Sequence, residues 1–346
     1  MNRERIKKLQ RTIKPPILIK KQENLFYLTG QWFMHGYLLV AKKGVVFFGD
    51  GLEKVEGIKK TDRLKYIGKY LGRSRVLQLE DEFTFAEYDY IKRKVQSEKR
   101  KTKIQHTKSP VDYQRQIKDL SELRLMGKSM NIVAKVFEQV RKQLRLRLWT
   151  EIGLANFIKT AGLKLGAEDV SFPPIVASGV NAAIPHHIPS SKRLKAGESI
   201  ITDFGFKYKG YCSDFTRTVF LKRAPLKLEQ AYNHVEKAYH ASMALVLVGT
   251  KTRDVYKRAV DVLAEKKLDK YFIHNLGHGA GLEIHELPNL SPKSKDVLEN
   301  GMVFSIEPGV YIPRLGGIRI EDLVYLHKGQ TKKFIHIQTE LRSNIL

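Results

Sequence analysis

The stretch from Glu198 to Phe220, ESIITDFGFKYKGYCSDFTRTVF, constrains the fold of this chain more than any other. Its pattern predicts two short β-strands joined by a turn, and each strand carries one aspartate, Asp203 and Asp214. If residues 208 and 209 form the turn, the two carboxylates lie directly opposite each other. If the turn is centred on Lys209-Gly210, they lie diagonally but on one face, because side chains alternate between faces with period two.

Two carboxylates on one face of a hairpin need compensation if that face is buried. Asp203 follows Ile200, Ile201 and Thr202, a pattern typical of a half-buried strand. Like charges held together there repel each other and are costly to desolvate. A divalent metal ion would compensate both charges. The alternative is a pair of solvated hairpin aspartates. The hairpin alone does not distinguish this alternative from a metal site, so other residues of the chain are needed.

Composition limits the class of protein. A chain of 346 residues is long for one core, so two domains are expected. A hydrophobic content of 42% excludes a disordered or collagen-like chain. The single cysteine, Cys212, rules out an intramolecular disulfide and fits a reducing compartment. The basic N-terminus lacks the apolar part of a secretory signal, and no apolar run is long enough to span a membrane. We therefore expect a cytoplasmic protein with no membrane partner.

A net charge of +26 raises the question of a nucleic-acid partner. The densest basic run lies between Lys92 and Lys103, but lysines and arginines are otherwise spread along the chain. No helix-turn-helix, zinc-finger or aromatic-basic RNA-binding motif accompanies them. We expect solvated basic surfaces with non-specific attraction to polyanions and no specific nucleic-acid partner.

Residues 1–112 alternate strands with helices, which predicts a small α/β domain. It contains no cluster of potential ligands or nucleophiles, so we assign it no chemistry. The expected helices are 1–14, 61–71 and 85–95, the expected strands are 17–19, 37–41, 45–48 and 76–79, and an apolar loop is expected at 24–30.

The basic stretch 92–112, which closes with Ser109-Pro110, is the predicted boundary to a second domain, 113–346. That domain begins with a long helical pattern over 113–148, which Gly127 is expected to break or kink. A cap-like pair, Thr150-Glu151, starts the next predicted helix, 150–166. The remaining expectations are a strand, turn and histidine-bearing loop over 172–189, helices over 228–248 and 252–267, and strands over 303–312 and 317–327.

Polar residues interrupt several of these apolar strands and glycine-rich turns: Asp203, Asp214, His278, Glu307 and Glu321. Four carboxylates and one imidazole suit one or two divalent ions such as manganese, iron, cobalt or zinc. The set is poor for a structural zinc site, which prefers thiolates. Shared carboxylates can hold two ions about 3.5–4 Å apart, which polarise a carbonyl and generate hydroxide at neutral pH.

Each of these residues also has a simpler interpretation. His278 could be a satisfied core or surface histidine, and Glu307 could be a surface turn glutamate. Glu321 and Asp322 could be an exposed acidic pair. Alternation along the strand puts Glu321 on the face of Arg319 and puts Asp322 on the other face. Glu321 is therefore the better metal candidate if Arg319 also points inward.

These residues lie, in order, in the motifs D-F-G-F, D-F-T-R-T, G-H-G-A-G-L-E-I-H-E-L-P, S-I-E-P-G-V-Y and G-I-R-I-E-D. In these motifs the chain resembles the metallopeptidases of the methionine aminopeptidase and Xaa-Pro peptidase family. The resemblance covers 113–346 and extends more loosely over 1–112, which resembles the N-terminal domain of prolidases, proline-specific aminopeptidases and creatinases. It implies an α+β fold, in which a C-terminal pita-bread (creatinase/aminopeptidase) catalytic domain follows a smaller α/β N-terminal domain.

The resemblance also implies a dinuclear site with two divalent metal ions per subunit. Mn²⁺ is the first expectation, with Co²⁺, Zn²⁺ or Fe²⁺ as alternatives. Asp203 would bind one ion, His278 and Glu307 the other, and Asp214 and Glu321 would bridge them. A bridging water or hydroxide would be the nucleophile, and Glu307 would shuttle its proton to the leaving amine.

Further residues match the family on the substrate side. His186 and His285 would hydrogen-bond substrate carbonyls and stabilise the tetrahedral intermediate. Arg319 would orient a metal-binding carboxylate beside the substrate, and Phe172 would help line an apolar pocket for proline. His187, next to His186, does not match.

We therefore expect a metal-dependent Xaa-Pro peptidase, either a dipeptidase or an aminopeptidase, that acts on small proline-containing peptides as a homodimer. One alternative is a metal-free protein of the same fold that binds peptides or nucleic acid, which the net charge of +26 favours and the complete ligand set disfavours. The other alternative is a creatinase-like C–N hydrolase. Creatinases lack the metal, so the complete ligand set disfavours this alternative too. The sequence sets neither the physiological metal nor the preferred peptide length.

Overall fold

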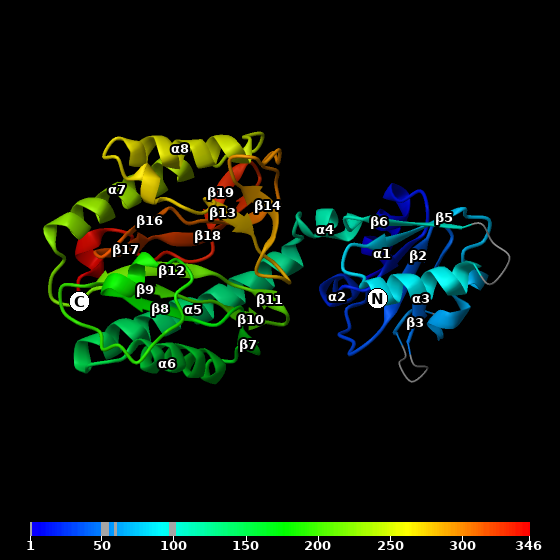
Figure 1. The fold of residues 1–346 in the computed structure, drawn as a ribbon, viewed down its shortest axis with the longest axis horizontal. Coiled ribbons are helices and arrows are strands. Elements are labelled where there is room, and N and C mark those ends of the chain that lie inside the picture. The colour runs from blue at the N-terminus through cyan, green and yellow to red at the C-terminus, as the bar shows by residue number, and fades with distance from the viewer. Residues whose placement is uncertain (1, 50–54, 59–60, 97–101) are drawn as a thin grey trace. The chain divides into compact units, whose positions relative to one another are not determined.

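A six-stranded mixed sheet with the order β4-β3-β2-β1-β5-β6 organises the N-terminal part of the chain. The computed structural model describes residues 2–49, 55–58, 61–96 and 102–346, and the chain divides into two units, Met1–Arg115 and Gln116–Leu346 (Figure 1). Our domain assignment, with its boundary after residue 112, stays a prediction. Part of the basic run, residues 97–101, lies outside the described residues.

The strands of this sheet are β1 (Ile17–Ile19), β2 (Tyr37–Ala41), β3 (Gly44–Phe48), β4 (Thr61–Asp62), β5 (Val76–Glu80) and β6 (Lys103–Thr107). The helices are α1 (Arg3–Thr12), α2 (Gln22–Thr29), α3 (Phe85–Gln96), α4 (Pro110–Arg115) and the 3-10 helix η1 (Leu64–Tyr70). Buried side chains of the sheet, α3 and η1 form one apolar cluster, which is the core of this unit.

Two expectations for this unit were wrong. The predicted loop at 24–30 is helix α2, which buries Leu25 and Leu28 and ends at Gly30 in the left-handed conformation (φ 79°) that favours glycine. The predicted helix at 61–71 starts with strand β4 and continues as η1. Strand β6 lies in the basic stretch that we assigned to a boundary, and its position at the sheet edge tolerates charged side chains.

An eight-stranded antiparallel sheet forms the centre of the second unit, with the order β14-β13-β15-β18-β12-β9-β8 and β19 paired to β18. Its strands are β8 (Ile175–Ser178), β9 (Ser199–Asp203), β12 (Phe215–Phe220), β13 (Gly277–Gly279), β14 (Glu286–Leu290), β15 (Val303–Ile306), β18 (Glu321–His327) and β19 (Gln330–Lys333). Smaller sheets contain β7 (Asp169–Val170), β10 (Phe206–Tyr208) and β11 (Tyr211–Cys212), and β16 (Gly309–Ile312) with β17 (Gly316–Arg319).

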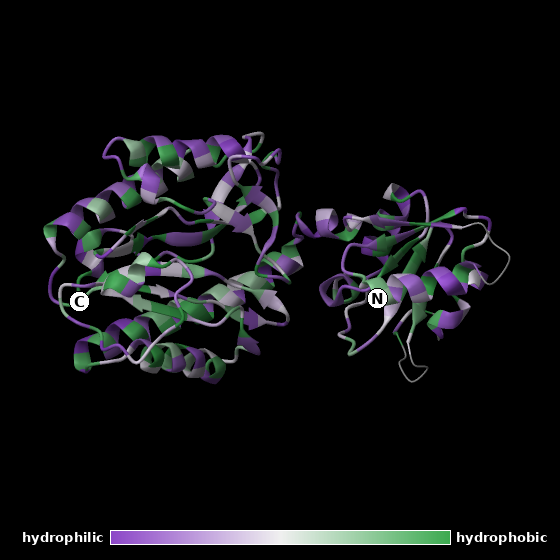
Figure 2. Ribbon diagram, viewed as in Figure 1, coloured by the Kyte–Doolittle hydropathy of each residue, from purple (hydrophilic) through white to green (hydrophobic). Residues whose placement is uncertain are grey.

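Helices cover these sheets from two sides (Figure 1). Helices α5 (Leu120–Leu146) and α6 (Glu151–Lys164) pack on β10, β11, β7 and β8. Helices α7 (Leu226–Met243) and α8 (Thr252–Ala264) pack on β15, β16, β17 and β14. Figure 2 shows hydrophobic residues on the inner strands and mixed hydropathy along the helices, as expected for helices with one buried face. Among the described helices, none is long and apolar enough to cross a membrane.

The aspartate hairpin follows the second of the two expected registers. Asp203 pairs with Thr216, and Tyr208 pairs with Tyr211 around a turn at Lys209 and Gly210. The two aspartates are therefore diagonal neighbours. The hairpin also divides after Asp203, where β10 and β11 leave the large sheet for a smaller one.

Other boundaries of the second unit differ from expectation in ways that concern the site. The pattern at 113–148 is two helices, α4 and α5, because Asp119 caps α5 with a capping box, whereas Gly127 lies inside α5 without breaking it. The predicted strand 303–312 divides into β15 and β16 around Glu307. The predicted strand 317–327 divides into β17 and β18 just before Glu321.

Candidate metal centre and active site

Five neighbouring strands of the large sheet each bring one polar residue to the same place. In the order β13, β15, β18, β12 and β9, these residues are His278, Glu307, Glu321, Asp214 and Asp203. Asp203 ends β9, Glu321 begins β18, Glu307 directly follows β15 and Asp214 directly precedes β12, whereas His278 is the middle residue of the short strand β13. Hydrogen bonding between adjacent strands therefore brings together residues that are up to 118 positions apart in the sequence, from Asp203 to Glu321.

The distances between these side chains are short. The Nε2 atom of His278 lies 3.5 Å from Oδ2 of Asp214 and 3.4 Å from Oε1 of Glu307. Asp214, His278 and Glu321 each offer a ligand atom within 4.8 Å of the others. Thr216 donates a hydrogen bond to Oε2 of Glu321 (2.7 Å). One ion could therefore contact at least three of the five side chains.

Burial acts on all four carboxylates, and repulsion by neighbouring carboxylates acts on Asp214, Glu321 and Glu307. Burial, followed by the charges of Glu321, Asp203 and Glu307, holds the pKa of Asp214 well above its usual range. Burial, with Glu307 and Asp203 next in effect, does the same to the pKa of Glu321. Burial raises the pKa of Glu307 to about 8, and it also raises the pKa of Asp203 despite the opposing effect of Arg319. This cluster is therefore costly to keep ionised without a cation.

One atom tests directly whether the residues fit a divalent ion. Oδ1 of Asp203 is buried and has no hydrogen-bond partner among the described residues. An unpartnered buried carboxylate oxygen is rare and calls for an explanation such as an ion. Its neighbours are three further carboxylates and one imidazole, the oxygen-rich donor set that such ions prefer. The residues present fit a divalent metal centre.

All nine residues that the sequence singled out line one cavity of about 600 Å³. They are Phe172, His186, Asp203, Asp214, His278, His285, Glu307, Arg319 and Glu321. The ring of His285 lies edge-on to that of His278, with 4.4 Å between centroids. Burial, then the neighbouring His278 and His186, lowers the pKa of His285, so this histidine is neutral at neutral pH. Apolar residues complete the wall: Pro173, Ile175, Pro185, Ile188, Pro189 and Ile284.

Residues 124–328 match the metallopeptidase family M24. This chain belongs to that family. It is 35% identical to a putative Xaa-Pro aminopeptidase of Mycoplasma pneumoniae, over 89% of this chain and 88% of that protein. It is 29% identical to a Xaa-Pro dipeptidase of Pyrococcus horikoshii, over 94% of this chain and 93% of that protein.

Solved structures of similar proteins agree with this assignment. The prolidase of Pyrococcus horikoshii superposes with a TM-score of 0.90 at 28% identity, over 98% of this chain and 99% of that chain. A Xaa-Pro dipeptidase of Bacillus anthracis also gives a TM-score of 0.90, at 31% identity over 98% of both chains. The predicted family and the predicted pita-bread fold with a smaller N-terminal part are confirmed.

A buried arginine, Arg319, holds several residues of the M24 site in place. Arg319 forms an ion pair with Oδ2 of Asp203 and donates from Nε to Thr216 Oγ1 (3.2 Å). Its Nη1 donates to the Tyr311 hydroxyl (2.7 Å) and to the Pro185 carbonyl (3.3 Å). The arginine points inward, as the interpretation of Glu321 required. It holds Asp203 on one oxygen and leaves the other free for an ion.

The sequence-based reasoning missed two residues of the M24 site, His274 and Tyr311. The Tyr311 hydroxyl lies 2.9 Å from Nε2 of His274, whose Nδ1 lies 2.7 Å from the Asn275 carbonyl. Burial, then the charge of Arg319, lowers the pKa of His274 to about 3, so His274 donates from Nδ1 and accepts from Tyr311. Tyr311 ends the motif S-I-E-P-G-V-Y, but its place depends on hydrogen bonds with His274 and Arg319 that no local pattern indicates.

Proposed function

We propose that this chain is a metal-dependent Xaa-Pro peptidase that hydrolyses the bond before proline at the N-terminus of dipeptides or longer peptides. The observation that carries the proposal is the convergence of five ligand-type side chains from adjacent strands in one cavity, with Oδ1 of Asp203 unpartnered. The similarity to proteins named Xaa-Pro aminopeptidase and Xaa-Pro dipeptidase supports the substrate class.

Two divalent ions would be held by five residues. These residues would be Asp203, Asp214, His278, Glu307 and Glu321, with Mn²⁺ as the first ion to test. Such ions, when bound, polarise the substrate carbonyl and lower the pKa of water. Thr216 and Arg319 hold the carboxylates of Glu321 and Asp203 in place through the hydrogen bond and ion pair described above.

The chain's own residues do the remaining work. Glu307 accepts a proton from the attacking water at a carboxylate oxygen and donates it to the departing amine. His186 and His285 donate hydrogen bonds to carbonyl oxygens of the substrate, where negative charge develops. Phe172 and the apolar wall of the cavity exclude water and accommodate the proline ring.

The experiment that tests this function uses metal-stripped protein with Mn²⁺ or Co²⁺ added back. We expect cleavage of a Xaa-Pro dipeptide or a Xaa-Pro-Xaa tripeptide that depends on the ion and disappears in Asp214→Ala. The preferred length then separates a dipeptidase from an aminopeptidase. Absence of turnover with any ion from folded protein would refute the proposal. Salt-dependent retention of RNA or DNA by that protein would then support a binding function consistent with the charge of +26.

Assembly and location are further parts of the proposal. We expect a homodimer in the cytoplasm, measured by sedimentation and by fractionation of the source cells. A monomer that cleaves at full rate would contradict the dimer.

A further inference from the structure

Glu151 is a buried carboxylate for which the proposed mechanism has no use. It is the first residue of helix α6, directly after the Thr150 cap, and its side chain is fully buried. In contrast to the carboxylates of the metal centre, it is completely hydrogen-bonded. Burial alone would raise its pKa, but hydrogen bonds from Ser190, His187, Ser178 and Asn181 outweigh burial and lower the pKa to about 2. Glu151 is therefore an ionised group whose charge is satisfied within the protein.

The donors to Glu151 lie at both ends of one loop. On the incoming side, the backbone N–H and hydroxyl of Ser178 each donate to Oε1 at 2.8 Å, and Asn181 Nδ2 donates at 3.0 Å. On the outgoing side, His187 Nε2 lies 2.9 Å from Oε2. The Ser190 N–H and hydroxyl donate to the same oxygen at 3.1 and 2.6 Å. One carboxylate thus closes the loop from Ser178 to Ser190.

This loop carries His186 into the cavity. The two adjacent histidines both line the cavity but differ in their contacts, since Nε2 of His187 lies 2.9 Å from Oε2 of Glu151, whereas His186 is exposed. At the tip, the Pro185 carbonyl accepts a hydrogen bond from Nη1 of Arg319 (3.3 Å). The backbone that presents His186 is therefore fixed on one side by Arg319 and on the other by Glu151.

We propose that Glu151 is a positioning residue for His186, acting through His187 and the two ends of the loop. The inference rests on the proposed function, in which His186 donates a hydrogen bond to the substrate. A donor that drifts by about 1 Å loses much of its effect on the transition state. The two adjacent histidines then have separate roles. His186 hydrogen-bonds the substrate, and His187 holds His186 in position through its contact with Glu151.

The hydrogen bonds of the Glu151 side chain can be changed while the backbone hydrogen bonds between α6 and the loop are kept. Two backbone hydrogen bonds also join α6 to the end of the loop, from Ile152 N to Ser190 O (2.9 Å) and from Glu151 N to Lys192 O (3.0 Å). Glu151→Gln keeps the shape of the side chain but places an NH₂ group where a carboxylate oxygen accepts from the N–H and hydroxyl of Ser178 or Ser190. It should loosen the loop while α6 and β8 stay in place.

The first experiment measures the loop itself and needs no activity. Hydrogen–deuterium exchange of metal-free Glu151→Gln should increase over residues 179–189 and stay unchanged in β9 and β12. The matched control is Glu122→Gln, another buried first-turn glutamate of the same unit, which accepts from Tyr211 and the Asp119 N–H. Unchanged exchange over 179–189 in Glu151→Gln, or an equal increase there in the control, would overturn the proposal. Wild-type protein without peptidase activity would refute the proposed function and leave this measurement valid.

The second experiment is a double-mutant cycle on kcat/KM with His186→Ala. Glu151→Gln alone should lower kcat/KM by about 10- to 100-fold, with metal content unchanged. In the His186→Ala background the same substitution should cost less than about twofold, because residues that act as one unit are not additive. An equal further loss in that background would overturn the proposal, as would kcat/KM of Glu151→Gln within twofold of wild type.

A conservative variant keeps the test decisive if Glu151→Gln is poorly folded. His187→Gln places a donor near the position of Nε2 and should retain most of kcat/KM, whereas His187→Ala should lose about tenfold or more. Equal losses in both variants would contradict an anchoring role for His187.

Discussion

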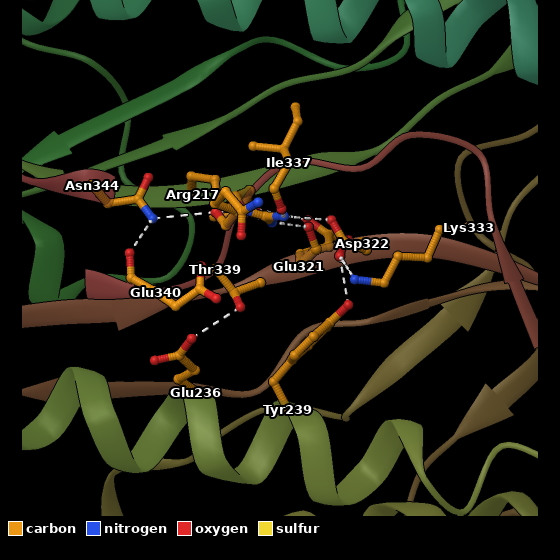
Figure 3. Close-up of polar contacts among 12 residues, drawn as sticks. Arg217, Glu236, Tyr239, Glu321, Asp322, Lys333, Ile337, Thr339, Glu340 and Asn344 are labelled. Atoms are coloured by element: carbon orange, nitrogen blue, oxygen red, sulfur yellow. Dashed lines mark hydrogen bonds and ion pairs between the residues drawn. The ribbon is translucent and has the colours of Figure 1, made fainter. Parts of the chain in front are cut away.

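Glu321 and Asp322 are neighbours in β18, both buried, and lie on opposite faces with opposite surroundings. Glu321 faces three other acidic residues, Asp203, Asp214 and Glu307, and accepts one hydrogen bond, from Thr216. Asp322 faces Arg217 (2.7 Å), Lys333 (2.8 Å) and the hydroxyl of Tyr239 (Figure 3). The comparison teaches that burial alone does not mark a functional acid, whereas a cluster of buried acids that outnumbers its cations does.

The pKa values of the two acids move in opposite directions for this reason. Burial raises the pKa of Glu321, and the neighbouring acids raise it further. Burial acts on Asp322 as well, but Arg217 and Lys333 outweigh it and lower the pKa of Asp322. On the Glu321 face, Arg319 pairs with Asp203 and leaves three further carboxylates that need a cation from solution, whereas Asp322 already has cations of its own.

Arg217 connects the two faces. Its guanidinium is fully buried, and Nη1 donates to the backbone carbonyls of Glu321 (2.6 Å) and Thr216 (2.9 Å). It also donates to the carbonyl of Ile337 (Figure 3) and to that of Gln338. The ion pair with Asp322 therefore supports the backbone from which Glu321 reaches the metal centre.

The largest expected effect on activity comes from Asp214→Asn. The substitution removes one of the proposed metal ligands, so kcat should fall by about 10³-fold or more, beyond the 10- to 100-fold typical of outer-shell changes. Without metal, the same variant should unfold at an equal or higher temperature, because one repulsive charge is gone. Steady-state kinetics and thermal unfolding in a chelator measure both.

A matched control is Asp261→Asn, at an exposed aspartate on α8 that pairs with Lys257. It should change the free energy of unfolding by no more than about 0.5 kcal/mol and leave kcat unchanged. An Asp214→Asn protein that is less stable than wild type without metal would contradict the comparison of the two faces.

In contrast to Asp214→Asn, Asp322→Asn should destabilise the metal-free protein. It leaves the Arg217 guanidinium buried without its counter-ion, which should cost about 3–5 kcal/mol of unfolding free energy. Urea unfolding of the metal-free protein measures this loss. If Arg217→Met combined with Asp322→Leu recovers none of it, the ion pair is not its cause.

Metal binding should stabilise the protein through the carboxylates on the Glu321 face and not through Asp322. At an ion concentration one hundred times Kd, the free energy of unfolding should rise by about 2.7 kcal/mol, and a chelator should reverse the rise. Asp214→Asn should lose this response, whereas folded Asp322→Asn should keep it. Thermal unfolding with and without Mn²⁺ measures it, and an equal response of both variants would break the assignment of the metal to the Glu321 face.

Much of the candidate site was predictable because its residues lie in short motifs at strand ends. Alternation along a strand separated Glu321 from Asp322. The register of the aspartate hairpin was narrowed to two options, one of which the structure has. These are local properties that a single sequence carries.

The parts that were missed depend on contacts between distant residues. Glu151 looked like a helix cap, and its role in the Ser178–Ser190 loop appears only once that loop folds back onto α6. The Arg217 network uses backbone carbonyls of Ile337 and Gln338, which no side-chain pattern can indicate. Helix α2 was missed because its eight residues are too few to show a helical period clearly.

The smallest expected effect separates the two cations that face Asp322. Lys333 is partly exposed and also lies over the Tyr239 ring, 5.0 Å from its centroid, whereas Arg217 is fully buried. Lys333→Met should therefore cost about 1 kcal/mol or less in urea unfolding, since solvent can replace much of an exposed ion pair. The neighbouring Lys332→Met, at an exposed lysine, should cost still less, and neither variant should change kcat. A loss of several kcal/mol in Lys333→Met would mean that Asp322 depends on both cations equally and that Arg217 alone does not anchor the backbone of Glu321.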